Sequence, residues 1–146
     1  MKVSTKGRYG LRFLLDVATH QERGNVTLKD VARRQGISEK YLWQIVNPLK
    51  TAGLIRATAG RGGGYTLARL PTEITLHDVL AVVEGDNAPD DRDTGAALFD
   101  SNSRATQEIW KEIDQKIADV LVSFTLGDLM EKHQQMNDNE SFSYVI

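Results

Sequence analysis

A run of polar and aromatic residues at positions 38–44 carries side chains that can recognise DNA bases. Gln44 can pair bidentately with adenine, Lys40 can bind guanine or a phosphate, and Glu39 can accept a hydrogen bond from cytosine. Such contacts require a helix that places these residues near its N-terminus in the major groove. The aromatic residues could equally pack against neighbouring elements, because large aromatic side chains favour burial. The predicted base-contacting residues are Ser38, Glu39, Lys40, Tyr41, Trp43 and Gln44.

Two further segments combine cations with accessible backbone groups, which suits them to bind phosphates. Hydroxyls, N–H groups and cations come together at the start of a predicted helix over 4–20; ordinary helix capping is the alternative explanation. At 60–64 an arginine stands between glycines, so its side chain can enter a minor groove while the backbone passes close to phosphates. The predicted contacts are Ser4, Thr5, Lys6, Arg8, Arg56, Gly60, Arg61 and Gly62.

The elements that must position these residues read as a helix-turn-helix over 28–53. Thr27 can cap the first helix, and Gly36 suits the left-handed residue that ends it. Ser38 can cap the second helix. The apolar positions of that helix recur at helical spacing, at Leu42, Ile45, Val46 and Leu49. Small residues at the crossing and glycine in the turn are typical of this motif.

Two strand-like runs, 55–58 and 65–68, follow the second helix and are joined by a glycine-rich stretch. They predict a hairpin wing over 54–69. The glycines could alternatively belong to a nucleotide-binding loop. Such a loop needs a helix after its glycines, whereas a strand-like run follows here, so the context favours a winged helix.

Composition limits the other classes of function. The 146 residues are 40% hydrophobic and include no cysteine, so we expect no disulfide, no thiolate nucleophile and no cysteine-ligated cluster. No apolar run is long enough to span a membrane, and the N-terminus lacks a signal-peptide core. His20, His77 and His133 are too scattered for a metal site, and no nucleophile–base–acid arrangement emerges. We therefore expect a cytoplasmic protein that is not an enzyme and has no metal or cofactor.

The net charge of −2 conceals a strong division between the two halves of the chain. Residues 1–70 hold 13 Lys and Arg against 4 Asp and Glu, which gives +9; residues 71–146 hold 5 against 16, which gives −11. A basic half that carries a helix-turn-helix fits binding to double-stranded DNA. An uneven but simply solvated surface is the alternative.

The acidic half predicts a dimerisation or regulatory region over 71–146. We expect a helix over 73–84 capped by Thr75, a flexible acidic loop over 85–103 that lacks the ligand spacing of a calcium loop, and a long helix over 104–124. A short amphipathic helix over 126–133 follows. The apolar seam of the long helix suits pairing with a second copy, and packing against its own winged domain is the alternative. The predicted interface is Ile109, Trp110, Ile113, Ile117, Val120 and Phe124.

Several segments together resemble the Rrf family of bacterial winged-helix transcriptional regulators. They are Lys-Val-Ser-Thr-Lys-Gly-Arg-Tyr at 2–9, Gln-Gly-Ile-Ser at 35–38, Tyr-Leu at 41–42 and the wing at 60–65. The resemblance extends to about residue 130. It implies a homodimeric repressor at an inverted-repeat operator, with the long C-terminal helix as the dimer interface.

The sequence departs from the cluster-binding members of that family, which carry three cysteines between the last two main helices. Here 85–103 has none, so the chain is similar to the cysteine-free, CymR-like branch. That similarity implies a role in cysteine metabolism with cysteine synthase as a partner, which would bind the apolar tail Tyr144, Val145 and Ile146. Packing of the tail onto the dimer is the alternative.

The expected fold is mainly α with a small β-hairpin: a winged helix-turn-helix domain over 1–70 and a long C-terminal dimerisation helix. The expected function is a homodimeric DNA-binding repressor. Two alternatives stay open. One is a DNA-binding sensor of a small ligand, bound between the helix at 73–84 and the long helix. The other is an adaptor that uses its winged helix for protein contacts and lacks salt-dependent affinity for duplex DNA.

Overall fold

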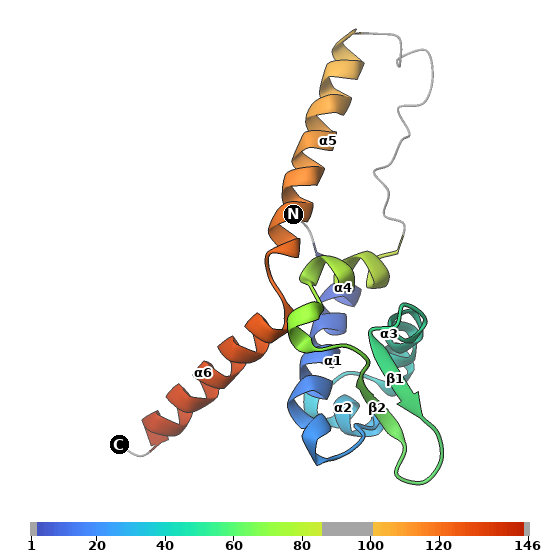
Figure 1. Cartoon of the computed structure of the whole chain (residues 1–146), viewed down its shortest axis with the longest axis vertical. Helices are drawn as coiled ribbons and strands as arrows, with labels where there is room; N and C mark the ends of the chain where they lie inside the picture. The colour runs from blue at the N-terminus through green and yellow to red at the C-terminus, as the bar shows by residue number, and fades with distance from the viewer. Residues whose placement is uncertain (1–2, 86–100, 145–146) are drawn as a thin grey trace.

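The computed structural model describes residues 3–85 and 101–144, with side chains to residue 141. The chain is mainly helical, with one small hairpin at an edge of the helical body, which confirms the expected fold class (Figure 1). The winged helix-turn-helix portion consists of α1 (Thr5–His20), α2 (Leu28–Gln35), α3 (Glu39–Thr51), β1 (Ile55–Thr58) and β2 (Gly64–Leu67). The remaining helices are α4 (Leu76–Val83), α5 (Ser101–Val122) and α6 (Leu126–Tyr144), and single 3-10 turns lie at Gln21–Arg23 and Pro71–Glu73.

The helix-turn-helix has the predicted ends. The Thr27 hydroxyl accepts a hydrogen bond from the Asp30 N–H at 3.1 Å, and the Ser38 hydroxyl accepts one from the Tyr41 N–H at 3.1 Å. Gly36 ends α2 in the left-handed conformation, with φ of 66°. Each cap satisfies an N–H group that has no partner within the first turn of the helix. These local bonds fix where α2 ends and α3 begins.

The hairpin pairs Ile55 with Leu67 and Thr58 with Gly64 in an antiparallel register. The second strand begins one residue earlier than expected, at Gly64. A separate bridge ties the hairpin to the turn before α2: Val26 and Tyr65 exchange two backbone hydrogen bonds, at 2.9 and 2.8 Å. This bridge fixes the wing to the helical body.

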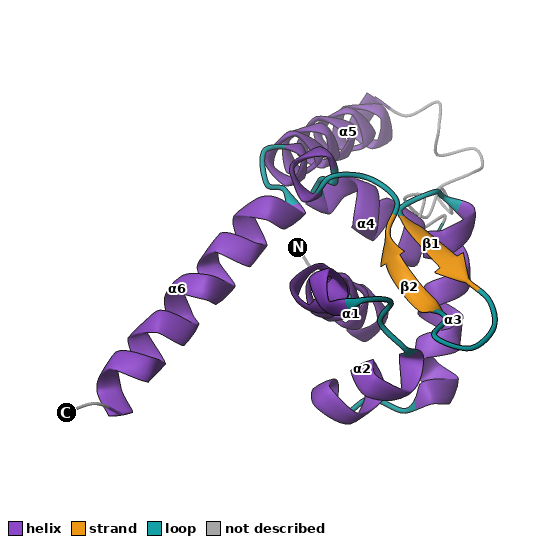
Figure 2. Cartoon of the chain, turned by 60° about the horizontal axis from the view of Figure 1, so that its bottom comes forward, coloured by secondary structure: helices purple, strands orange, loops and turns teal. Residues whose placement is uncertain are grey.

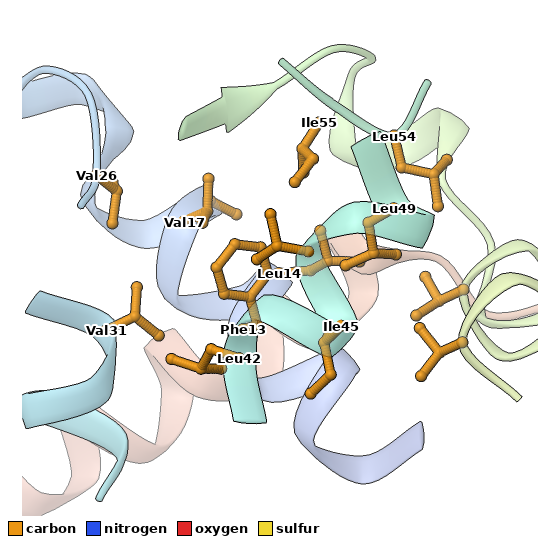
Figure 3. Close-up of a cluster of buried hydrophobic side chains, with 14 of the residues drawn as sticks. Phe13, Leu14, Val17, Val26, Val31, Leu42, Ile45, Leu49, Leu54 and Ile55 are labelled. Atoms are coloured by element: carbon orange, nitrogen blue, oxygen red, sulfur yellow. The ribbon is translucent and has the colours of Figure 1, made fainter. Parts of the chain in front are cut away.

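One hydrophobic core lies between α1, α2, α3, the hairpin, α4 and the first residue of α6 (Figure 3). The side chain of Phe13 is fully buried at its centre, together with those of Leu42 and Ile45 from α3. Burial of each such side chain contributes about 1.5–3 kcal/mol to folding. The core therefore fixes the inner face of α3 and leaves its outer face to solvent.

A polar cluster joins α1 to the end of α2. The buried Asp16 carboxylate accepts hydrogen bonds from Arg34 Nη2 at 2.6 Å, Arg34 Nε at 3.0 Å and Gln35 Nε2 at 2.9 Å. Nearby, Arg12 Nη2 donates to the Gln35 carbonyl at 2.8 Å. Burial alone would raise the pKa of Asp16, but the bonds from Arg34 and Gln35 and the Arg34 charge outweigh it and lower the pKa.

The second half begins differently from the sequence prediction. Residues Pro71–Glu73 form a 3-10 turn, and α4 starts only at Leu76, not at Glu73. The reason is a capping box at Thr75: its hydroxyl accepts from the Asp78 N–H at 3.0 Å, and its own N–H donates to the Asp78 carboxylate at 3.0 Å. The predicted acidic loop lies mostly outside the described residues, and its last three positions, 101–103, belong to α5.

The prediction of a short last helix over 126–133 was wrong, because α6 continues to Tyr144. The polar run after His133 contains no glycine or proline to end the helix, and Gln134 bonds Asp138 one turn later at 3.1 Å. At the first residue of α6, the Leu126 N–H donates a hydrogen bond to the Ile74 carbonyl at 2.8 Å. Beyond this anchor, α5 and α6 leave the body in different directions (Figures 1 and 2).

Replacing Asp16 by Asn tests the polar cluster. We expect Asp16→Asn to lower the free energy of unfolding at pH 7 by about 2 kcal/mol, because Arg34 loses its buried ionic partner. The control Glu112→Gln removes only an exposed pair with Lys116 and should cost less than about 0.5 kcal/mol. Urea unfolding followed by circular dichroism measures both.

The same variant predicts a pH dependence. Because the folded-state pKa of Asp16 lies below its ordinary value of 3.8, its stabilisation is complete above that value and is lost as the pH falls through the folded-state pKa. The stability difference between wild type and Asp16→Asn should therefore close in strongly acidic buffer. A difference that is constant from neutral to acidic pH would contradict this account.

Candidate nucleic-acid interface

The outer face of α3 is exposed, as a base-reading helix requires. Leu42, Ile45, Val46 and Leu49 point into the core, so the opposite face carries Glu39, Lys40, Trp43 and Gln44. Trp43 is 52% exposed and is not packed away as the alternative had it. Tyr41 is half-buried and stacks edge-on against Tyr9, with ring centroids 5.5 Å apart.

The sequence analysis missed two residues on this face. Asn47 and Lys50 are exposed and follow Lys40, Trp43 and Gln44 at helical spacing. The spacing itself could have identified them, because residues three, four and seven apart share one side of a helix. An Asn can pair with adenine and a Lys can contact a phosphate, so both extend the candidate surface.

The tip of the wing is a tight turn that presents Arg61. The Gly63 N–H donates to the Gly60 carbonyl at 3.0 Å, and Gly62 has φ of 76°. A positive φ at this position of a four-residue turn defines a type II turn, which favours glycine there. Arg61 occupies the other central position and is exposed, so its guanidinium can extend beyond the hairpin.

The base of the wing depends on a close approach of two backbones. A Cβ atom on Gly64 would lie 2.6 Å from the Val26 carbonyl oxygen, and Gly64 has φ of 151°. Asn25, which sequence reasoning missed, donates from Nδ2 to the Gly62 carbonyl at 3.0 Å. Its contact lies 37 positions away in the chain, so no local pattern could have indicated it.

At the N-terminus of α1, Ser4 caps the helix and also bonds the carboxylate of Glu84. The Ser4 hydroxyl accepts from the Gly7 N–H at 3.1 Å and donates to Glu84 Oε1 at 2.6 Å, and the Ser4 N–H bonds the same oxygen at 2.9 Å. Ser4 therefore has the structural role that was the alternative for it, and its hydroxyl could reach a phosphate only by leaving Glu84. Thr5 and Arg8 are exposed beside it, and Lys6 is half-buried.

Four cations on α3 and the wing are available for phosphates. They are Lys40, Lys50, Arg56 and Arg61. None of the four lies within ion-pair distance of a carboxylate of residues 3–85 or 101–144. All four are exposed. An unpaired surface cation releases counterions when it meets a phosphate, which favours binding to duplex DNA.

A separate apolar surface lies on α5. This helix has no buried residue, so the alternative that its seam packs against its own winged domain is not what the structure shows. Five of the six predicted interface residues are at least 39% exposed, and Ile117 is half-buried. A pocket of about 330 Å³ opens on this face, lined by Ile113, Lys116, Ile117, Val120 and Leu121.

The remaining expectations concern the chain end, metals and membranes. The predicted tail begins at Tyr144, the last residue of α6, and continues outside the described residues. The described part of the chain holds no group of three or more potential ligand side chains that could bind a metal ion. It also has no helix of the length and apolar character needed to cross a bilayer.

Comparison with known proteins identifies one family. Residues 3–132 match the family model Rrf2, described as an iron-dependent transcriptional regulator. The chain is 39% identical over 145 residues to the HTH-type transcriptional regulator CymR of Bacillus subtilis, covering 99% of this chain and 98% of that protein. It is 35% identical over 149 residues to IscR of Aliivibrio salmonicida, covering 100% of this chain and 88% of that protein.

Solved structures agree with the sequence relatives. The structure of CymR, described as the global cysteine regulator of B. subtilis, superposes with a TM-score of 0.74 at 37% identity, over 90% of this chain and 98% of that one. The structure of T. potens IscR gives a TM-score of 0.74 at 38% identity, over 93% and 90%. These relatives are regulators of transcription and not enzymes.

Replacing Arg61 by Ala tests the wing tip. The exposed side chain makes no hydrogen bond or ion pair with the described residues, so stability should not change. We expect weaker binding to duplex DNA and a salt slope lower in magnitude by about 1, because one cation fewer displaces counterions from the duplex. The control Arg104→Ala removes the same charge from the exposed start of α5. Fluorescence anisotropy at several salt concentrations measures both, and a wild-type slope for Arg61→Ala would exclude the contact.

Proposed function

Because the chain belongs to the Rrf2 family of transcriptional regulators, we propose that it is a homodimeric repressor that binds an inverted-repeat operator. Its relatives are DNA-binding regulators. Dimerisation and repression are what we propose in addition for this chain. The observation that carries it is an exposed apolar face on α5 in a chain whose α3 and wing also face solvent.

The apolar face of α5 supports pairing of two copies. Ile109, Trp110 and Val120 are 52%, 62% and 57% exposed, and water contact at a continuous apolar stripe is unfavourable. Apolar residues that recur at intervals of three and four suit a second helix of the same kind. A two-fold axis through such a pair would place two copies of α3 on one side of DNA.

A symmetric pair of winged helices fits two half-sites about one helical turn apart. We assign base contacts to the exposed face of α3, minor-groove contact to Arg61, and phosphate contacts to the cations of α3 and the wing. In this assignment Asn47 and Lys50 join the residues expected from sequence. The basic part, 1–70, acts as the DNA-binding unit and 71–146 as the dimerisation unit, in line with their opposite charges.

Placing a charge in the α5 seam tests the dimer. We expect Ile113→Glu to give a monomer in sedimentation velocity and to lose most affinity for an inverted repeat, because a buried, unpaired carboxylate is costly. Gln115→Glu is the matched control: it adds the same charge on the opposite side of α5. Gln115→Glu should remain dimeric. A dimer of unchanged affinity for Ile113→Glu would contradict the assigned interface.

The absence of cysteine and the similarity to CymR support a more specific proposal about what the regulator controls. With no cysteine in the chain, we propose a regulator that works without a cysteine-ligated iron–sulfur cluster and that controls sulfur metabolism through a protein partner. Cysteine synthase is the proposed partner, bound through Tyr144, Val145 and Ile146. An exposed apolar segment can enter a pocket on a partner protein.

Deleting residues 143–146 tests the tail. The deletion should abolish binding to cysteine synthase in a pull-down or calorimetric titration, because the anchoring side chains are removed. It should leave the dimer and its DNA affinity intact, since α5 and α3 are unchanged. Retained binding to cysteine synthase would show that the tail does not form the contact.

A further inference from the structure

A polar pocket of about 250 Å³ lies where α1, the last residue of α2 and α6 meet. Arg12, Asp16 and His20 line it from α1, Gln35 from α2 and His133 from α6. None of its lining residues belongs to the exposed face of α3 or to the apolar seam of α5. None of the functions proposed above uses it.

The one acid in this pocket is already matched. Asp16 is 3% exposed, and its oxygens accept from Arg34 and Gln35. Arg34 supplies a full compensating charge at 2.6 Å. The charge left to the pocket therefore comes from Arg12, and the two histidines add ring nitrogens that can donate hydrogen bonds. A pocket of this character attracts anions.

Donors remain free to bind such an anion. Arg12 uses Nε for the Gln35 side chain at 3.2 Å and Nη2 for the Gln35 carbonyl at 2.8 Å, so its Nη1 group has no partner among the described residues. His20 holds the Asp16 carbonyl through Nδ1 at 2.8 Å, which leaves Nε2. His133 is half-buried and makes no hydrogen bond with residues 3–85 or 101–141.

We propose that this pocket binds a small carboxylate metabolite, held between Arg12 and His20 on one side and His133 on the other. The volume admits a ligand of a few carbon atoms and not a nucleotide. Guanidinium and protonated imidazole are strong donors to a carboxylate. The bound acid would therefore hold α6 against α1.

The position of the pocket gives the ligand a means of regulation. Gln35 precedes Gly36, the turn into α3, while α6 follows directly from the end of α5. A ligand shared between these elements joins the base-reading helix to the proposed dimer helix. This consequence rests on the proposed function, whereas binding of the acid does not.

The histidine ring signals of the full-length protein provide a direct test, with succinate as the probe. The chain has three histidines, and His77 on α4 does not line the pocket. We expect saturable NMR shifts of His20 and His133 and none of His77. Succinamide, which has the same shape without charge, should produce no shift.

Two variants complete the test. His133→Gln should weaken succinate binding about tenfold, as expected for loss of one hydrogen bond to a charged group, and the control His77→Gln should not change it.

Equal shifts of all three histidines, or none, would overturn the site. Unchanged affinity in His133→Gln would overturn the role of α6. The titration contains no DNA, so it is independent of the operator and dimer experiments: the site can fail while the regulator is confirmed, and the reverse.

Discussion

The orientation of α3 depends on how α1 holds α2. The Asp16 carboxylate, fully enclosed, binds Arg34 and Gln35 at the end of α2, and Arg12 binds the Gln35 carbonyl. The turn at Gly36 then leads directly into α3, whose inner face is fixed by the core. Because both ends of the turn are held, the outer face of α3 has one orientation relative to the wing, which a base-reading surface requires.

The wing and the proposed dimer helix α5 differ in how their own chain supports them. The wing is held by backbone contacts. The bridge between Val26 and Tyr65 ties it to the body, and the turn at Gly62 leaves Arg61 exposed. The helix α5 contacts α4 but has no buried residue. Exposure of its apolar face to water is unfavourable, and in the proposed dimer a second copy would cover this face and supply the second half-site reader.

Features set by neighbours in sequence could be predicted, and those set by distant contacts could not. The caps at Thr27, Ser38 and Thr75 act within three residues, so their residue types indicate them directly. The Asp16–Arg34 pair spans 18 positions, and the bond from Ser4 to Glu84 spans 80. The full length of α6 was missed because the polar run after His133 was taken as the end of the helix. A helix ends at a helix-breaking residue or a cap, and polarity alone does not end it. Asn47 and Lys50 were missed for a different reason: base contacts were expected only from the N-terminal part of α3, although helical spacing places both residues on the same face.

In the proposed assembly, two copies of this chain read two related half-sites. Selection of sheared genomic DNA by the purified protein, followed by sequencing of the retained fragments, is the most direct test. We expect enrichment of one inverted repeat with half-sites about one helical turn apart. Uniform retention with no shared element, or enrichment of isolated single half-sites, would contradict it.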